Sequence, residues 1–304
     1  MLRRMTSARK SRSLSELSPS RPAPALAIAG VRPTKSRGQN FLTSGAIADR
    51  IVRAAELDAS DHIIEVGPGL GILTEKIATS SRRSLTLVEL DGRLASRLAD
   101  RFADDSAICV INADFLSFDF ASLAAVPPVK VIGNLPFNVA AAILRRLSDN
   151  AGLISRMVLM FQREVAARIR AHPGDDGYSA LSVYTALYWD IDLHFAVAAG
   201  SFHPRPKVDA EVLRFTPRKA SLFAVDEERT VLEVVRASFS APRKQIRNSL
   251  THSLGIDAPT VVRALERAGI DPAARAETLG VPDFIRLARA LGLALPRTIG
   301  RRDA

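Results

Sequence analysis

The strongest constraint on the fold is the stretch Ile63-Ile64-Glu65-Val66-Gly67-Pro68-Gly69-Leu70-Gly71. Its first four residues are mostly apolar and include β-branched types, which is typical of a buried parallel strand. Three glycines follow at every second position, where the chain must turn tightly and where the backbone can approach a ligand closely. The stretch therefore predicts a strand that ends in a nucleotide-type binding turn.

Apolar stretches and helical periodicity alternate over the following residues. The pattern predicts helix 72–79, strand 84–89, helix 92–102, strand 107–111 and strand 129–133. Strands that alternate with helices form a parallel sheet with right-handed crossovers, and ligands bind at the carboxyl ends of such strands. The sequence thus predicts an α/β fold with a doubly wound sheet.

The last part of the chain is helical throughout. Helices are expected at 227–239, 243–254, 260–268 and 282–293, beyond the break at Pro217. We therefore expect three parts: a basic tail that does not fold alone (1–37), an α/β domain (38–217) and a helical domain (218–304).

The positive charge of the chain is concentrated in the tail. Residues 1–37 carry nine Lys or Arg against one acid, Glu16, and so hold +8 of the net charge of +10. A Ser-, Pro- and Arg-rich segment of this kind is typical of an arm that binds nucleic acid. A transit peptide for an organelle and a simple solvated extension have the same composition and stay open as alternatives.

Other classes of protein are excluded by what the sequence lacks. No apolar run approaches the roughly 20 residues that span a bilayer, so we expect a soluble, cytoplasmic protein without a membrane partner, and we expect a monomer. The only cysteine, Cys109, lies in an apolar run and is expected to be a buried thiol. The five histidines show no ligand spacing, so no metal site is expected.

Three details indicate which cofactor the glycine turn binds. The position where a dinucleotide fingerprint requires its third glycine is occupied by Ile72, which argues against NAD. Glu89 closes the second strand, where a carboxylate can accept both hydroxyls of a ribose. Asp114 follows the third strand, where it can accept from the amine of an adenine. A cofactor that contains adenosine without a pyrophosphate fits best, namely S-adenosylmethionine.

The stretch Asn134-Leu135-Pro136-Phe137 carries the predicted chemistry. The exocyclic amine of adenine is a poor nucleophile because its lone pair is delocalised into the ring. The Asn134 side-chain oxygen and the Leu135 carbonyl can each accept one amine hydrogen and so turn the lone pair toward a methyl donor. Pro136 fixes the backbone and Phe137 can stack on the base. Alignment of this kind accounts for most of the catalysis of an in-line methyl transfer.

Several segments together resemble the KsgA-type ribosomal RNA adenine dimethyltransferases. In chain order they are 38–42, 65–71, 88–91, 112–114, 134–137, 161–166, 202–209 and 238–250, and the resemblance covers about residues 35–292. It implies a methyltransferase sheet of seven strands, an all-α C-terminal domain, and dimethylation of two adjacent adenosines in a hairpin loop near the 3′ end of small-subunit rRNA. The expected partner is that rRNA or the immature small subunit.

The resemblance also implies roles for individual residues. The residues that would line the cofactor site are Asn40, Leu42, Gly67, Glu89, Asp114 and Asn134. The target base would meet Asn134, Leu135, Pro136 and Phe137, with Phe202 as a second stacking ring. Phe137 stands where the family often has Tyr, and an aromatic ring is kept.

Three basic residues are candidates for RNA contact. Arg243, Lys244 and Arg247 fall on one predicted helix at spacings that place them near one face. A solvated charged face is the common explanation for such residues, whereas the resemblance favours contact with the RNA backbone.

Two other functions remain open from the sequence. A macrolide-resistance type methylase of large-subunit rRNA shares the glycine turn and the Asn-Leu-Pro-aromatic ending, but the stretches 202–209 and 243–250 favour the small-subunit enzyme. The other alternative is a non-catalytic RNA-binding assembly or transcription factor on the same fold, against which Asn134 and Phe137 argue.

Overall fold

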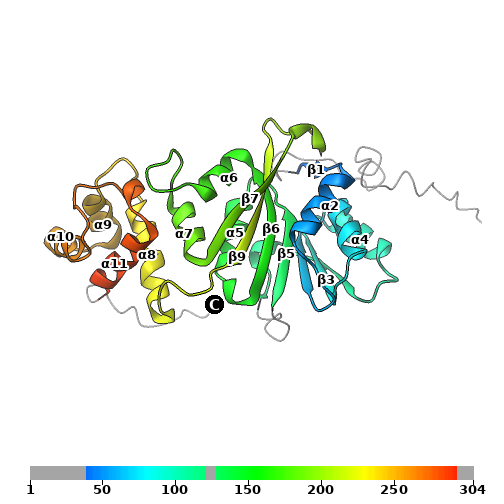
Figure 1. The fold of residues 1–304 in the computed structure, drawn as a ribbon, viewed down its shortest axis with the longest axis horizontal. Helices are drawn as coiled ribbons and strands as arrows, with labels where there is room; N and C mark the ends of the chain where they lie inside the picture. Colours follow the sequence, from blue (N-terminus) through cyan, green and yellow to red (C-terminus); the bar gives the residue numbers. More distant parts are fainter. Residues whose placement is uncertain (1–38, 121–127, 293–304) are drawn as a thin grey trace, which may run out of the picture. The chain divides into compact units, whose positions relative to one another are not determined.

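The computed structural model describes residues 39–120 and 128–292 (Figure 1). Their contacts divide the chain into two compact units. The first comprises the residues up to Ala140 with Arg156–Phe161 and His194–Arg214, and the second comprises Ala141–Ser155, Gln162–Leu193 and the residues from Phe215 on. The predicted tail, 1–37, lies outside the described residues.

Seven strands form one sheet in the order β4-β3-β2-β5-β6-β9-β7. Their bounds are β2 (His62–Val66), β3 (Ser84–Glu89), β4 (Ile108–Asn112), β5 (Val129–Asn134), β6 (Ile154–Gln162), β7 (Trp189–Val197) and β9 (Ala210–Pro217). β2 pairs in parallel with β3 and β5, and β3 pairs in parallel with β4. The predicted α/β sheet of seven strands is confirmed, and the carboxyl ends of β2, β3, β4 and β5 meet at one edge.

Among the described residues of the first unit, three α-helices pack together: α2 (Gly45–Ala54), α3 (Ile72–Ala78) and α4 (Gly92–Arg101). Figure 1 shows α2 and α4 beside β3. α2 begins at Ser44, whose hydroxyl oxygen accepts a hydrogen bond from the Ile47 amide, as an N-cap residue should. The apolar faces of α2 and α3 join the sheet in one core that includes Ile51, Ile77, Leu85 and Ile132.

A second, two-stranded sheet was not predicted from the sequence. β1 (Phe41–Leu42) pairs antiparallel with β8 (Phe202–His203), with Phe41 opposite His203 and Leu42 opposite Phe202. The pairing places an N-terminal segment beside one that follows it in the chain by about 160 residues.

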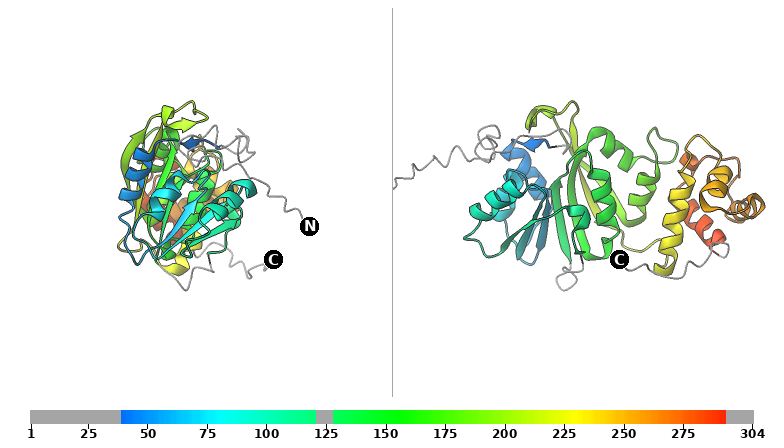
Figure 2. Two further views of the ribbon diagram at one scale, coloured as in Figure 1. Left: turned by 90° about the vertical axis from the view of Figure 1, so that its right-hand side faces the viewer. Right: turned by 180° about the vertical axis from the view of Figure 1, so that it is seen from behind.

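The second unit is mainly helical. Its helices are α5 (Ala140–Ser148), α6 (Arg163–Arg170), α7 (Ala180–Tyr188), α8 (Glu228–Ser238), α9 (Ile246–Leu254), α10 (Ala258–Arg267) and α11 (Val281–Leu291). The yellow-to-red helices α8 to α11 lie together in the view from behind (Figure 2). They share a core with α7 that includes Val234, Leu250, Leu265 and Phe284. The predicted helical C-terminal part is therefore confirmed.

The division into sequence domains stays a prediction. The contacts group α6 and α7 with the four C-terminal helices, whereas the predicted domains divide the chain at 217/218. One hydrogen bond in this unit joins the residues before α7 to those before α11, from the Tyr178 hydroxyl to the Leu279 carbonyl at 2.8 Å.

The expectation of a buried thiol at Cys109 is wrong, because this side chain is exposed. β4 is an outer strand of the sheet, and α4 packs beside it. Neighbouring residues of a strand point to opposite faces. An apolar run in an outer strand can therefore be covered on one face and open on the other.

The prediction that Arg243, Lys244 and Arg247 share one helix is also wrong. α9 begins at Ile246, and Arg243 and Lys244 lie in the turn before it, where the Lys244 amide donates to the Ala241 carbonyl at 2.9 Å. The Ile246 amide donates to the Ala274 carbonyl at 2.8 Å. This bond to a residue far along the chain fixes the start of the helix, and no local pattern reveals it.

Among residues 39–120 and 128–292, no helix has the length and apolar character needed to cross a membrane. In the same ranges, no three His, Cys, Asp or Glu side chains gather in a way that could hold a metal ion.

Candidate active site

The glycine turn after β2 depends on glycine at more than one position. Gly67, Gly69 and Gly71 have φ angles of 63°, 59° and 85°, a region in which side chains are strained. Space is also closed, because a Cβ on Gly69 would lie 3.0 Å from the Phe41 ring and one on Gly71 would lie 2.9 Å from Leu98 Cδ2. Without side chains at these positions, the backbone of the turn is not covered at the edge of the sheet.

Glu89 ends β3 and is held by the glycine turn. Its side chain is 6% exposed. Its Oε2 accepts from the Gly69 amide and its Oε1 accepts from the Asp91 amide, both at 2.9 Å. Burial raises the pKa of this carboxyl group above its ordinary value. Each carboxylate oxygen can accept a further hydrogen bond, so Glu89 keeps the capacity to bind two hydroxyl groups.

Asp114 lies at the same edge, after β4. β3 and β4 are parallel neighbours in which Glu89 is opposite Asn112, so Asp114 follows two residues beyond that pair. Its side chain is exposed, and its Oδ1 accepts from the Leu116 amide at 2.9 Å. The two predicted acceptors, Glu89 and Asp114, thus belong to adjacent strand ends.

Two apolar side chains at this edge were missed by the sequence analysis. Leu90 is 58% exposed and Leu116 is 37% exposed, which is unusual for large apolar residues. Leu90 follows Glu89 directly, and Leu116 follows Asp114 by two residues. Exposed apolar groups beside convergent polar groups are typical of a ligand site. Hydropathy alone assigns both leucines to a core, so the sequence offered no signal that they are exposed.

Glu65 is a second residue that the sequence did not single out. It is 1% exposed, and its Oε2 accepts from the Thr74 hydroxyl at 2.7 Å. Burial, with a smaller contribution from the charge of Glu89, raises the pKa of Glu65 to about 8. Because Thr74 belongs to α3, the bond ties the strand before the glycine turn to the helix after it.

Asn134 ends β5, the neighbour of β2, and uses only one end of its amide. Its Nδ2 donates to the Asn40 carbonyl at 2.9 Å. Its Oδ1 is buried and has no hydrogen-bond partner among the described residues. An unpaired buried acceptor costs about 1–3 kcal/mol. This oxygen is therefore available to a donor that enters the site.

The two residues after Asn134 connect it to the rest of the site. The Leu135 side chain is buried, and its amide donates to the Met160 carbonyl at 3.4 Å. A Cβ on Gly67 would lie 3.9 Å from Pro136 Cδ. The glycine turn and the stretch 134–137, which are predicted to meet, therefore lie side by side.

The two predicted stacking rings are also together. The centroids of Phe137 and Phe202 lie 6.5 Å apart with an angle of 65° between the rings. Phe137 is half-buried and Phe202 is buried. Because the rings meet edge to face, only one of them can lie flat against a given base in this arrangement. Phe137 is the more accessible of the two.

Asn40 and Leu42 reach the site through the pairing of β1 with β8. The Asn40 carbonyl binds Asn134, and the Leu42 side chain is 2% exposed. Leu42 could therefore contribute to a ligand site through its backbone rather than its side chain. Both residues belong to the first unit, with every other residue predicted for the cofactor and the base.

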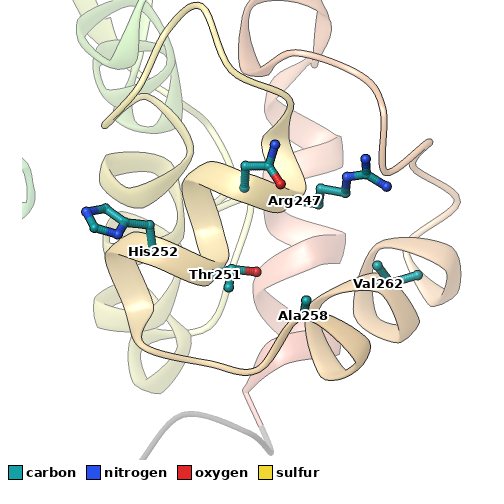
Figure 3. Close-up of a pocket in the computed structure, with 6 residues that line it drawn as sticks. Arg247, Thr251, His252, Ala258 and Val262 are labelled. Carbon is teal, nitrogen blue, oxygen red and sulfur yellow. The ribbon is translucent and has the colours of Figure 1, made fainter.

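The basic candidates belong to the second unit. Arg243, Lys244 and Arg247 are all exposed. Beside them lies an open hollow between α9 and α10 (Figure 3), whose lining residues are Arg247, Asn248, Thr251, His252, Ala258 and Val262. Positions 241 to 256 contain no Asp or Glu, so the charged side chains of this stretch are all basic.

Comparison with known proteins adds to this geometry. The model of a protein family described as ribosomal RNA adenine dimethylase matches residues 31–292. A protein of Geobacter metallireducens called ribosomal RNA small subunit methyltransferase A is 40% identical over 266 residues, which cover 86% of this chain and 96% of that protein. A protein of the same name from Xanthomonas oryzae pv. oryzae is 40% identical over 256 residues, which cover 84% and 94%.

Two solved structures are similar as well. A dimethyladenosine transferase from Plasmodium falciparum has a TM-score of 0.71 at 23% identity, and the match covers 83% of this chain and 97% of that one. This likeness shows the fold. The 23S rRNA methyltransferase ErmE has a TM-score of 0.62 at 29% identity, and the match covers 83% of this chain and all of that one.

Proposed function

The chain belongs to the ribosomal RNA adenine dimethylase family, and from this premise we propose that it methylates two adjacent adenosines in a hairpin loop near the 3′ end of small-subunit rRNA. It is an S-adenosylmethionine-dependent rRNA adenine dimethyltransferase. The names of the curated relatives support the small subunit as the substrate, and such a reaction belongs to ribosome biogenesis.

The residues at the sheet edge fit S-adenosylmethionine. When bound, this cofactor supplies an electrophilic methyl group on a sulfonium. Glu89 would accept from the ribose hydroxyls and Asp114 from the adenine amine, while Leu90 and Leu116 would cover the apolar faces of the adenine. Asn40, Leu42, Gly67 and Asn134 would line the remainder of the cofactor site. The bare backbone of the glycine turn supports this assignment, since it leaves room for a close approach.

The observation that carries the proposed mechanism is the unpaired Oδ1 of Asn134. The role we propose for it is to accept a hydrogen from the exocyclic amine of the target adenine. The Leu135 carbonyl would accept the second amine hydrogen. With both hydrogens held, the nitrogen lone pair turns out of conjugation and toward the methyl donor. Alignment of this kind lowers the barrier without a strong base.

The aromatic side chains would hold the ring of the target base. An adenine in a duplex hides its amine, so the target must be unpaired or turned out of its stack. Phe137 would then lie against the base, and Pro136 would keep the preceding carbonyl pointed into the site. Phe202 supports Phe137 from the side in the arrangement seen here and remains a candidate for the second stacking ring.

The positive surface of the second unit would bind the RNA backbone. Arg243, Lys244 and Arg247 are exposed and lie in a stretch without acidic residues. The hollow between α9 and α10 adds the amide of Asn248 and the hydroxyl of Thr251, which are common donors to phosphate oxygens (Figure 3). We also propose that residues 218–304 form a separate domain for this task.

The alternatives have less support. The match to ErmE is the observation that supports a large-subunit methylase. The chain shares 29% sequence identity with ErmE, which is lower than the 40% that it shares with the small-subunit enzymes. A non-catalytic factor on the same fold would have no need of an unpaired amide oxygen beside an aromatic ring. We further propose that the enzyme acts as a monomer in the cytoplasm.

The decisive experiment is methyl transfer from labelled S-adenosylmethionine to small subunits that lack the modification and, in a parallel reaction, to large subunits. The modified bases are then mapped by primer extension and mass spectrometry. We expect dimethyladenosine at two adjacent positions near the 3′ end of the small-subunit rRNA. Label in large-subunit rRNA alone would contradict the proposed substrate, and absence of transfer to either subunit would favour the non-catalytic factor.

A further inference from the structure

Asn134 is held by a short segment, Asn40–Thr43, which we call the N-terminal clasp. The Asn40 carbonyl accepts from Asn134 Nδ2 at 2.9 Å. The next two residues form β1 and pair with β8. Thr43 then donates twice to the Ser201 carbonyl, from its amide at 2.9 Å and from its hydroxyl at 3.0 Å.

The clasp is packed as well as hydrogen-bonded. Leu42 is 2% exposed, Phe202 opposite it is 4% exposed, and both belong to the core of the first unit. Phe41 lies against the glycine turn, where its ring leaves no room for a side chain at Gly69. The position of the Asn40 carbonyl is therefore set from both sides.

An amide side chain has a donor end and an acceptor end, and its surroundings decide which end points where. A carbonyl oxygen can only accept, so Asn40 selects the Nδ2 end of Asn134. The Oδ1 end is then left for the target amine, and no described residue competes for it. The same pairing of β1 with β8 holds Phe202 beside Phe137.

We propose that the N-terminal clasp positions the catalytic amide: Asn40 orients Asn134 through its carbonyl, and Thr43 is a positioning residue that fixes the clasp to Ser201. This inference rests on the role proposed above for Asn134. It goes beyond that role because it assigns a task to residues that need not touch the RNA.

The first test compares two substitutions of one residue. Thr43→Val removes the hydroxyl donor and keeps the shape of the side chain, whereas Thr43→Ser keeps the donor. We expect Thr43→Val to slow single-turnover methyl transfer at saturating cofactor by about two- to tenfold, which is the effect of one hydrogen bond. Thr43→Ser should keep the rate of the parent enzyme. Thr79→Val is the matched control, because this exposed hydroxyl binds only carbonyls of its own helix. Equal rates for all three variants would overturn the proposal.

The second test asks whether Thr43 acts through Asn134. In an Asn134→Ala background there is no amide to orient, so the added Thr43→Val should slow the rate by a smaller factor than it does in the parent enzyme. A loss of the same size in both backgrounds would refute the assigned route. Asn134→Asp should be as inactive as Asn134→Ala, because a carboxylate offers no donor to the Asn40 carbonyl. An active Asn134→Asp enzyme would contradict the proposal.

The third test does not depend on activity. The side-chain amide signal of Asn134 can be assigned in a selectively ¹⁵N-labelled enzyme by its loss in Asn134→Ala. Thr43→Val should shift this signal and speed its hydrogen exchange, and Thr79→Val should leave both unchanged. An unchanged signal in Thr43→Val would refute the clasp even in an enzyme that methylates the expected bases. A shifted signal in an enzyme that methylates other bases would refute only the proposed substrate.

Discussion

The proposed active site in the first unit and the proposed RNA surface in the second differ in how their polar groups are held. The Glu89 side chain is buried and accepts hydrogen bonds from two backbone amides. The Asn134 side chain donates a hydrogen bond to the Asn40 carbonyl. Arg243, Lys244 and Arg247 are exposed, and α9 begins only after the first two of them. One region has fixed geometry, and the other has charge on side chains that can move.

The two regions therefore depend on different interactions: short-range hydrogen bonds in the first unit and longer-range charge interactions in the second. Buried, hydrogen-bonded groups act over short distances and lose their effect when an atom moves, so they suit the alignment of a reacting amine. Exposed charges act over about 10 Å at moderate salt and tolerate disorder of the side chain, so they suit attraction of an RNA backbone. Substitutions in the first unit should therefore change chemistry or cofactor affinity, and those in the second should change RNA affinity in a salt-dependent way.

The largest effect is expected for Asn134→Ala. Loss of one positioning group of this kind costs about 10²–10³ in rate, by analogy with the loss of one donor from an oxyanion hole. The fold should survive, because the side chain lies at a strand end and makes one hydrogen bond, to the Asn40 carbonyl. Single-turnover rates on unmethylated small subunits measure the effect, and circular dichroism checks folding. A rate within a few-fold of the parent would mean that Asn134 does not align the amine.

Glu89→Ala should weaken cofactor binding. Charge-assisted hydrogen bonds to the ribose contribute about 1.5–3 kcal/mol, which corresponds to about a 10- to 150-fold higher dissociation constant. Calorimetric titration with S-adenosylmethionine measures this constant, and a melting curve accounts for the lost bonds to the Gly69 and Asp91 amides. An unchanged constant in a folded variant would remove Glu89 from the cofactor site.

Phe137→Ala should reduce transfer through the loss of base stacking worth about 1–3 kcal/mol. Phe137→Tyr is the control, because it keeps the ring face and should be nearly silent. The ratio kcat/KM on unmethylated subunits reports both variants. If Phe137→Tyr were as damaging as Phe137→Ala, the ring would act by filling space rather than by stacking.

Arg247→Ala should have the smallest effect and a different signature. One lost phosphate contact lowers the slope of the salt dependence of RNA binding by about 0.7–0.9 and leaves cofactor affinity unchanged. Arg289→Ala removes an equal charge from the same unit, but Arg289 is paired with Glu227, so it should change the slope less. Binding measured at several salt concentrations distinguishes them. Equal slopes for the parent and Arg247→Ala would exclude this phosphate contact.

The sequence predicted what depends on local pattern. The glycine turn, the alternation of strands and helices, and the strand endings at Glu89 and Asn134 can all be read from short stretches. Parallel strands bring such endings to one edge, so their meeting could be predicted as well. The place of Phe202 came only from the resemblance to a known family, because more than sixty residues separate it from Phe137.

What the sequence did not predict depends on tertiary contacts. Leu90 and Leu116 are read as ordinary core residues by their hydropathy, and only the structure shows that they are exposed. Cys109 is a similar case, because it lies in an apolar run and its side chain is nevertheless exposed. The start of α9 is set by a bond to Ala274, and the bond between Asn40 and Asn134 joins residues 94 positions apart. The periodicity of the sequence does not reveal which distant residues form such hydrogen bonds.

The pairing of β1 with β8 also affects when the enzyme can become active during its own synthesis. Thr43 and Ser201, which bond to each other, are 158 residues apart, so the N-terminal segment leaves the ribosome long before its partner. At about 5–20 residues per second this delay is about 8 to 32 seconds. During that time the Asn40 carbonyl cannot be fixed by β8, and the site for the target base is incomplete. A nascent chain shorter than about 203 residues therefore lacks the strand that pairs with β1.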